Sequence, residues 1–204
     1  MHYDFLALGD SYTIGEGVDL AEGWPAQLVE LLAEDALHFN PPNIIAQTGW
    51  TTDDLLTALD TQKPSSRYHL VSLLIGVNNQ YQSLDIAAYQ QGFEQLLERA
   101  IAYADGVAGR VLVLSIPDWG VTPFAQKDES RSPAQIAEEI DAFNKINCSV
   151  AYRAGCMYAD VTVLTREHKM DTHAWAADGL HPGPLLYTHW ARKLQPQLRL
   201  RLTA

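Results

Sequence analysis

The sequence FLALGDSYTIG, residues 5–15, is an apolar run that stops at a small, polar turn bounded by glycines. An apolar run of this length near the start of a chain predicts a buried strand over residues 3–9, and the turn places Ser11 at one edge of the sheet that this strand enters. Serine is common in turns, so Ser11 could simply cap the next segment through its hydroxyl. The alternative hypothesis is that Ser11 is a nucleophile, and residues elsewhere in the chain have to separate the two.

The pattern of a strand followed by a helix recurs along the chain. Further strands are predicted over residues 43–48, 68–75, 110–116 and 157–161. Helices are predicted to begin near Pro25, at Thr51, after Asp85 and after Ser132, and a last helix is predicted over residues 186–198. Parallel neighbours need crossover connections, so the alternation predicts an α/β protein, a three-layer α/β/α sandwich with a five-stranded parallel sheet. No repeat or linker-like segment interrupts residues 1–204, which predicts a single domain.

Charge and composition exclude several classes of protein. The 204 residues include 14 Lys and Arg against 25 Asp and Glu, a net charge of -11, so nucleic acid is not an expected partner. No apolar run approaches the roughly 20 residues that span a bilayer, which predicts no membrane span. The first residues contain neither a basic segment nor a long apolar segment typical of a signal peptide, so a cytoplasmic location is expected.

Neither the cysteines nor the histidines predict a metal site. Cys148 and Cys156 do not have a metal-binding spacing, and we expect both to be reduced thiols without a chemical role. The C-terminal third is rich in His and Asp, but it lacks a helical pair of histidines and clustered thiolates. We therefore expect no metal and no other cofactor. The connection over residues 118–131 is long for a compact domain, which is typical of functional loops.

Chemically suited residues follow the predicted strands. Ser11 comes after the first strand, Gly49 after the second, Asn78 after the third, and Asp178 and His181 after the last. Ligands of open parallel sheets bind beyond the carboxyl ends of the strands, where these residues would meet. A serine hydroxyl needs an imidazole to remove its proton, and a carboxylate three residues earlier is close enough to orient that imidazole. The N–H groups of Ser11 and Gly49 and the amide of Asn78 would then be donors to an oxyanion.

Each of these residues also has a purely structural interpretation. Asp178 and Asn78 could close turns, Gly49 could allow a positive φ, and His181 could lie at the start of the last helix without a reactive role. Their joint occurrence at successive strand ends favours an acyl-transfer site. The chain lacks a Gly-x-Ser-x-Gly motif, which argues against the α/β-hydrolase arrangement.

The chain resembles the SGNH (GDSL-type) hydrolases in four places. These are Gly9-Asp10-Ser11, Gly49, Gly76-Val77-Asn78-Asn79 and Asp178-Gly179-Leu180-His181-Pro182, in the order of the family's four blocks. The resemblance implies a flavodoxin-like sandwich and hydrolysis of esters or thioesters without a cofactor. It also implies a Ser11-His181-Asp178 triad and an oxyanion hole formed by Ser11, Gly49 and Asn78. The chain departs from the family at Tyr12, where leucine is usual, and at Asn79, where aspartate is usual.

Aromatic residues are frequent in the loops expected near the site. Rings there could stack on a sugar or line a short acyl slot, and they could equally pack their own loops against the core. The candidate residues for contact with a small-molecule ester substrate are Tyr12, Trp50, Asn79, Trp119 and Trp175. The predicted function is a serine esterase for short-chain acyl or acetyl esters. The alternatives are a lysophospholipase or acyl-thioesterase for longer chains, and a ligand-binding protein without turnover.

Overall fold

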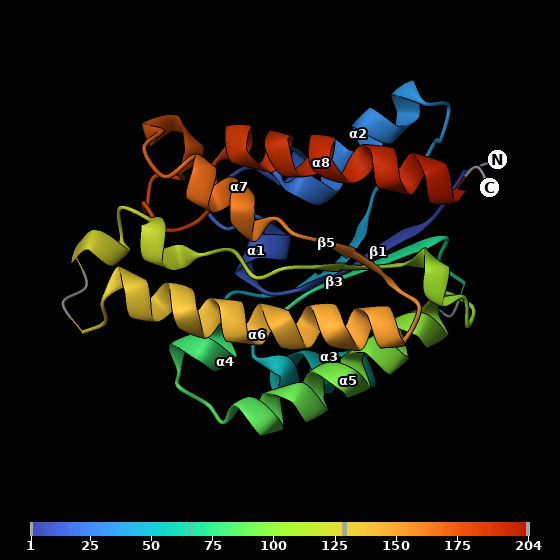
Figure 1. Cartoon of the computed structure of the whole chain (residues 1–204). Coiled ribbons are helices and arrows are strands. Elements are labelled where there is room, and N and C mark those ends of the chain that lie inside the picture. The colour runs from blue at the N-terminus through green and yellow to red at the C-terminus, as the bar shows by residue number, and fades with distance from the viewer. Residues whose placement is uncertain (1, 66, 128–129, 203–204) are drawn as a thin grey trace.

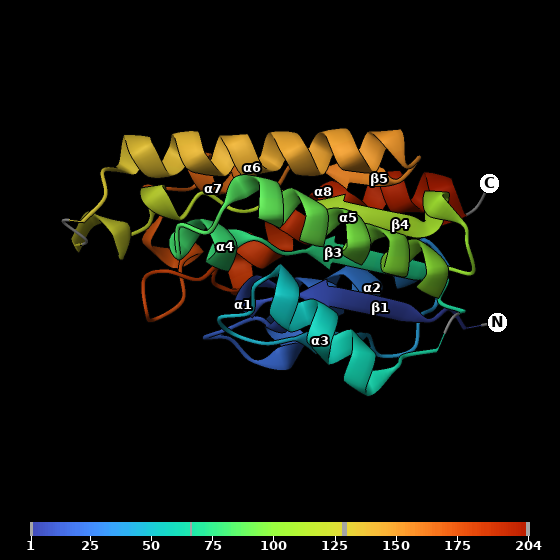
Figure 2. The same cartoon turned by 90° about the horizontal axis from the view of Figure 1, so that it is seen from below.

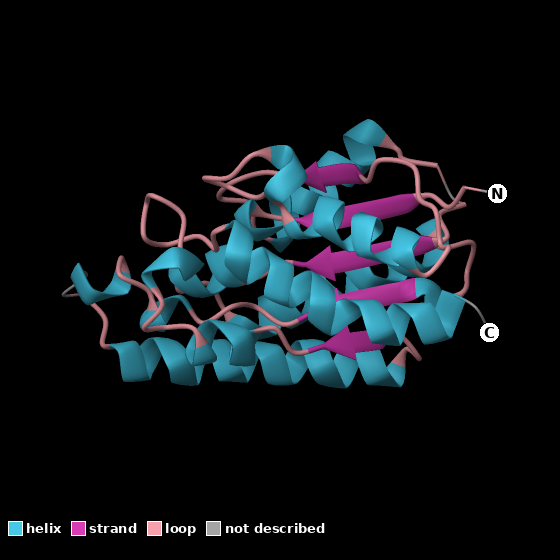
Figure 3. Cartoon of the chain, turned by 90° about the horizontal axis from the view of Figure 1, so that it is seen from above, coloured by secondary structure: helices cyan, strands magenta, loops and turns pink. Residues whose placement is uncertain are grey.

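Five parallel strands form one sheet in the computed structural model, which describes residues 2–65, 67–127 and 130–202. The strands are β1 (Phe5–Gly9), β2 (Asn43–Ala46), β3 (Leu70–Leu74), β4 (Val111–Leu114) and β5 (Met157–Ala159), in the sheet order β2-β1-β3-β4-β5. All strand arrows in Figure 3 point the same way. The segments that follow the strands therefore gather at one edge of the sheet, the edge formed by the carboxyl ends of the strands. Residues 128–129 of the predicted long loop and the two ends of the predicted 1–204 domain, residues 1 and 203–204, lie outside the described residues.

Helices cover both faces of the sheet, which confirms the three-layer sandwich (Figures 1 and 2). The helices are α1 (Ser11–Ile14), α2 (Trp24–Glu34), α3 (Thr52–Gln62), α4 (Val77–Tyr81), α5 (Ile86–Tyr103), α6 (Pro133–Arg153), α7 (Thr162–Glu167) and α8 (Pro184–Leu202). Helices α2 and α8 pack against each other on one face, and α3, α5 and α6 cover the other. Short 3₁₀ turns lie at Leu20–Glu22, Ala108–Arg110, Trp119–Val121, Ala125–Lys127 and Thr172–Ala174.

The inner strands are apolar at nearly every position because both of their faces are covered. Every residue of β1, β3 and β4 is buried, whereas β2, at the edge, is buried only at Ile45. The strands are shorter than the apolar runs that predict them. Residues 68–75 were expected as one strand, but β3 is Leu70–Leu74, because the N–H of Tyr68 bonds outside the sheet to the carbonyl of Tyr103.

The predicted helix starts agree closely with the structure. Each predicted N-cap side chain accepts a hydrogen bond from the backbone N–H three residues later: Thr51 from Asp54, Asp85 from Ala88 and Ser132 from Gln135. The last helix is longer than the predicted 186–198, since α8 begins at Pro184, directly after the loop that carries His181. These capping side chains therefore fix the residue at which each loop ends and its helix begins.

Three short helices were not predicted, and two of them carry candidate site residues. Helix α1 begins at Ser11, and α4 begins at Val77 and includes Asn78. Segments of this length contain too few residues to show a helical period in the sequence. The expected turns after β1 and β3 are therefore helical turns, which present Ser11 and Asn78 from the first turn of a helix.

Other features bear on membranes, metals and thiols. None of the helices in the described part of the chain is long and apolar enough to cross a membrane. Within residues 2–65, 67–127 and 130–202, no group of three His, Cys, Asp or Glu side chains is placed to hold a metal ion. Cys148 and Cys156 are both free, as expected.

Candidate active site

Ser11 is presented by a tight turn at the end of β1. Asp10 is the N-cap of α1, and its Oδ1 accepts a hydrogen bond from the N–H of Tyr12 at 3.1 Å. A side chain at Gly9 would overlap Thr13 and the carbonyl oxygen of Leu74, so only glycine allows α1 to lie this close to the neighbouring strand. The side chain of Ser11 is nearly buried, yet it lines a pocket.

His181 and Asp178 form a short, direct pair in the loop before α8. The imidazole Nδ1 lies 2.6 Å from Oδ2 of Asp178, and Oδ1 of Asp178 accepts the N–H groups of Leu180 at 2.8 Å and His181 at 3.0 Å. Partial burial acts to raise the pKa of the Asp178 carboxyl, but the hydrogen bonds from the His181 ring and from these two N–H groups outweigh it and lower the pKa below its ordinary value. An ionised Asp178 holds the proton on Nδ1, which leaves Nε2 as the basic nitrogen.

The loop around His181 is fixed by backbone pairing. Trp175 and Pro182 form an antiparallel bridge, the N–H of Ala176 donates to the carbonyl of His181 at 2.8 Å, and the N–H of Gly183 donates to the carbonyl of Ala174 at 2.7 Å. The ring of Tyr12 lies edge-on to the imidazole, with 5.6 Å between the ring centroids. The imidazole is therefore held between its carboxylate partner and an aromatic wall.

Gly49 and Asn78 lie in the same pocket as Ser11. Gly49 has a φ of +86°, which a residue with a side chain adopts only with strain, and this conformation presents the loop after β2 to the pocket. The Nδ2 of Asn78 donates to the carbonyl oxygen of Trp50 at 2.9 Å. One N–H of the amide is used by this bond, which orients the group, and the other N–H remains to donate elsewhere.

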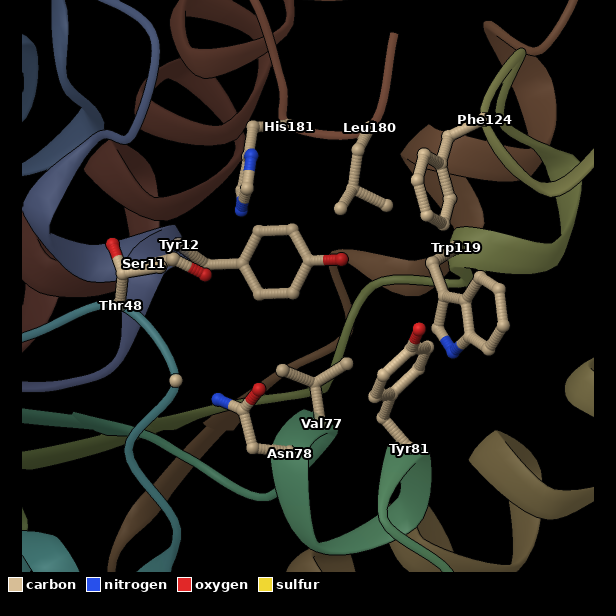
Figure 4. Close-up of a pocket in the computed structure, with 11 residues that line it drawn as sticks. Ser11, Tyr12, Thr48, Val77, Asn78, Tyr81, Trp119, Phe124, Leu180 and His181 are labelled. Atoms are coloured by element: carbon tan, nitrogen blue, oxygen red, sulfur yellow. The ribbon is translucent and has the colours of Figure 1, made fainter. Parts of the chain in front are cut away.

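The pocket has a volume of about 220 Å³ and lies at the edge where the strands end (Figure 4). It is lined by Ser11, Tyr12, Thr48, Gly49, Val77, Asn78, Tyr81, Trp119, Phe124, Leu180 and His181. In Figure 4 Ser11 and His181 lie at one end, Trp119, Phe124 and Tyr81 at the other, and the side chain of Tyr12 extends between them. The polar groups thus meet at one end of a largely apolar cavity.

Among the five predicted substrate-contact residues, three do not line this pocket, and neither does Asp178, which lies behind His181. Trp50 contributes its carbonyl oxygen to the bond with Asn78. Asn79 is buried, and its amide accepts from the N–H of Thr52 at 3.1 Å and donates to the Thr52 hydroxyl at 3.0 Å. Trp175 packs inside the His181 loop. These three residues therefore pack and hydrogen-bond the segments around the pocket and do not form its wall.

Five further residues line the pocket beyond the candidate site residues, although the sequence already indicates Tyr81 and Phe124 as aromatic residues of loops near the site. The five are Thr48, Val77, Tyr81, Phe124 and Leu180. The sequence does not show that α4 is a helical turn. This turn brings Val77 and Tyr81 to the pocket together, because residues four apart share one face of a helix. Leu180 stands between Asp178 and His181, so its position in the motif is enough to predict that it lies at the site.

Replacement of Asp10 by asparagine is expected to stabilise the protein at alkaline pH. Complete burial raises the pKa of the Asp10 carboxyl to about 7, against the lowering effect of nearby backbone N–H groups. A carboxyl with a raised folded-state pKa costs stability as the pH rises from about 4 to about 7. Because the pKa of Asp10 is higher by about three in the folded protein, the loss of stability at high pH is roughly 4 kcal/mol at most. Asparagine keeps the oxygen that accepts the N–H of Tyr12.

Urea unfolding of Asp10→Asn and the unmodified protein at pH 4 and pH 8 measures this difference. The two proteins are expected to have similar unfolding free energies at pH 4, and the variant is expected to be the more stable at pH 8. A variant that is less stable at pH 8 would show that Asp10 is ionised and favourably solvated in the folded protein.

The fold, with a serine after β1 and a His–Asp pair before the last helix, defines the class of SGNH hydrolases. A family model described as GDSL-like Lipase/Acylhydrolase family matches residues 7–189, and the chain belongs to this family. The protein is therefore an enzyme that hydrolyses ester bonds. No curated protein matches the chain significantly.

Solved structures with the same fold cover nearly the whole chain. The crystal structure of TesA has a TM-score of 0.72 and 23% identity, covering 97% of this chain and 99% of TesA. The lipase/acylhydrolase from Enterococcus faecalis has a TM-score of 0.72 and 18% identity, covering 98% and 97% of the two chains. The acetylxylan esterase Axe2 from Geobacillus stearothermophilus has a TM-score of 0.71 and 18% identity, covering 96% and 94%. These similarities establish the fold.

Proposed function

We propose that the protein is a serine esterase that hydrolyses short-chain acyl or acetyl esters through an acyl-enzyme on Ser11. The observation that carries the proposal is the 2.6 Å pair of His181 and Asp178 beside a pocket that Ser11, Gly49 and Asn78 also line. Nucleophile, base, orienting carboxylate and oxyanion donors are the parts that acyl transfer requires.

Acylation begins when Ser11 Oγ attacks the ester carbonyl and His181 Nε2 takes the hydroxyl proton. The imidazolium that forms is stabilised by the ionised Asp178 at Nδ1. Negative charge develops on the carbonyl oxygen, which receives hydrogen bonds from the N–H groups of Ser11 and Gly49 and from Nδ2 of Asn78. As the tetrahedral intermediate collapses, His181 returns its proton to the departing alcohol.

Deacylation repeats these steps with water as the nucleophile. His181 takes a proton from the water, whose oxygen attacks the acyl carbonyl on Ser11. Collapse of the second intermediate breaks the bond to Ser11 Oγ, which regains its proton from His181, and the acid is released. All groups in this cycle belong to the chain itself, so the cycle proceeds without a cofactor.

The pocket supports a small acyl group over a long one. A volume of about 220 Å³ accommodates a short chain, and the walls opposite Ser11 are mostly aromatic and aliphatic. The similar Axe2 is an acetylxylan esterase, which is consistent with a small acyl group.

Covalent labelling tests the assignment of Ser11. A serine-directed organophosphonate is expected to label the unmodified protein at one site, Ser11 in a peptide map, and to abolish hydrolysis of 4-nitrophenyl butyrate. Ser11→Ala is expected to be unlabelled, while the control Ser149→Ala, at an exposed position in α6, is expected to label fully. Labelling of Ser11→Ala at another residue, with activity retained, would refute the proposal.

A further inference from the structure

The end of the pocket opposite Ser11 is closed by a wall that separates it from a second cavity. Trp119 lines the pocket, and Gln80 lines the second cavity, which has a volume of about 320 Å³. The second cavity is lined by Gln80, Ser83, Leu84, Ile86, Glu139, Ala142 and Phe143. Trp119 and Gln80 are in direct contact, so the two cavities adjoin at this pair of side chains, which we call the partition.

The partition is held in place by hydrogen bonds. The indole Nε1 of Trp119 donates to Oε1 of Gln80 at 2.8 Å, and Nε2 of Gln80 donates to Oε2 of Glu139 at 2.6 Å. Both Trp119 and Gln80 are 2% exposed. A buried donor with a single partner is costly to displace, so the indole has one strongly preferred position.

The loop that carries Trp119 is anchored behind the pocket as well. Asp118 accepts the N–H of Gly120 at 2.9 Å, and its other oxygen accepts from Nε of Arg166 at 2.8 Å. Because Asp118 is buried and precedes Trp119 directly, this ion pair fixes the backbone from which the indole projects. The wall is therefore a rigid part of the fold.

The other two aromatic side chains at this end form a rim that is open to solvent. Tyr81 is 47% exposed and Phe124 is 36% exposed, in contrast to the buried Trp119. The Tyr81 ring lies 5.4 Å from the Trp119 ring, at 67° to it, and the Phe124 ring lies 6.5 Å away. An acyl chain attached to Ser11 thus meets the indole of Trp119, and a longer one must turn outward past Tyr81 and Phe124 (Figure 4).

We propose that Trp119, positioned by Gln80, sets the length of acyl chain that this enzyme buries. The inference rests on the proposed esterase function. The acyl group is the occupant because it stays attached to Ser11 between the two half-reactions, while the alcohol leaves and water enters. Methylenes between Ser11 and the indole are buried, and methylenes beyond it lie in solvent and add nothing to transition-state binding.

A series of 4-nitrophenyl esters from acetate to decanoate measures this length. In the unmodified enzyme kcat/KM is expected to rise about fourfold with each buried methylene and then to become flat once the chain reaches Trp119. In Trp119→Ala the chain is expected to continue toward the second cavity. The break is then expected at least two carbons later, with the ratio of long to short esters raised by about tenfold or more.

Two further variants separate the wall from the general stability of the fold. Trp119→Phe keeps an aromatic ring of smaller size and is expected to move the break by a smaller step, which keeps the inference testable where alanine does not fold. Gln80→Met removes the acceptor for the indole N–H while it preserves bulk. As Gln80 is a positioning residue, its loss is expected to alter the chain-length profile and to shift the tryptophan fluorescence attributable to Trp119, with kcat for acetate little changed.

The control is Tyr152→Ala, an exposed aromatic position on α6, which is expected to leave the profile unchanged. A break that stays at the same length in a folded Trp119→Ala enzyme would overturn the inference, as would a shift seen only when the alcohol is lengthened at constant acetate. Both results presuppose an active enzyme labelled at Ser11. An inactive, unlabelled enzyme would instead overturn the proposed function, so the two failures are distinguishable.

Discussion

His181→Ala is expected to lower kcat for 4-nitrophenyl butyrate by about 10⁴- to 10⁶-fold, with a much smaller change in KM. In the proposed mechanism, loss of the imidazole leaves Ser11 Oγ without an acceptor for its proton and the departing alcohol without a donor. In a comparable serine hydrolase, loss of either the serine or the histidine costs about 10⁶-fold in kcat. Steady-state kinetics with active-site titration measures the effect. The control is His38→Ala. His38 is an exposed histidine that precedes β2, so it lies near the amino ends of the strands, away from the pocket.

The double variant Ser11→Ala/His181→Ala sharpens this test. In the proposed mechanism Ser11 and His181 act in one step, so removing both is expected to cost about the same as removing either one. Independent contributions would instead multiply, and the double variant would be slower than each single variant by the full factor of the other. Retention of more than a tenth of the activity in His181→Ala would show that another group is the base.

The fold was predictable because local signals agree with long-range packing. The apolar runs identify every strand, and the side chains of Thr51, Asp85 and Ser132 mark the helix starts at which the structure places caps. Strand ends were less predictable, since pairing depends on the neighbouring strand as well as on the run itself. The short helices after β1 and β3 were missed because one turn of helix leaves no period in a sequence.

The site was predictable as far as strand order allows. The four residues Ser11, Gly49, Asn78 and His181 line one pocket because each belongs to a segment that leaves the same edge of the sheet. Which side chain of a segment faces the pocket depends on local backbone. Successive residues of a helix point about 100° apart, so in α4 Asn78 faces the pocket while Asn79 reaches Thr52 of α3.

The pocket wall required tertiary information. The sequence indicated aromatic loops, but only the packing separates a buried Trp119 from an exposed Tyr81. The hydrogen bond between Trp119 and Gln80 joins residues of two distant segments, and no spacing rule predicts it.

Asn78→Ala is expected to lower kcat by about 10²- to 10³-fold while KM changes by only a few fold. The Nδ2 of Asn78 has one N–H bonded to the carbonyl oxygen of Trp50, and this bond fixes the direction of the other N–H. A donor held in this way costs no reorganisation when charge develops on the substrate oxygen, and loss of one such donor typically costs about 3 to 4 kcal/mol of transition-state stabilisation. A matched control is Asn79→Ala, which removes the neighbouring amide and its bonds to Thr52.

The division of the effect between kcat and KM decides the role of Asn78. A ground-state carbonyl gains little from the donor, whereas the tetrahedral oxyanion gains its full strength, so the loss belongs to kcat. Asn78→Asp preserves the shape of the side chain but replaces the donor with a carboxylate, and repulsion of the oxyanion is expected to make it at least as slow as Asn78→Ala. An effect of Asn78→Ala confined to KM, or an aspartate variant that is faster than the alanine variant, would remove Asn78 from the oxyanion hole and leave it as a residue that only binds the substrate.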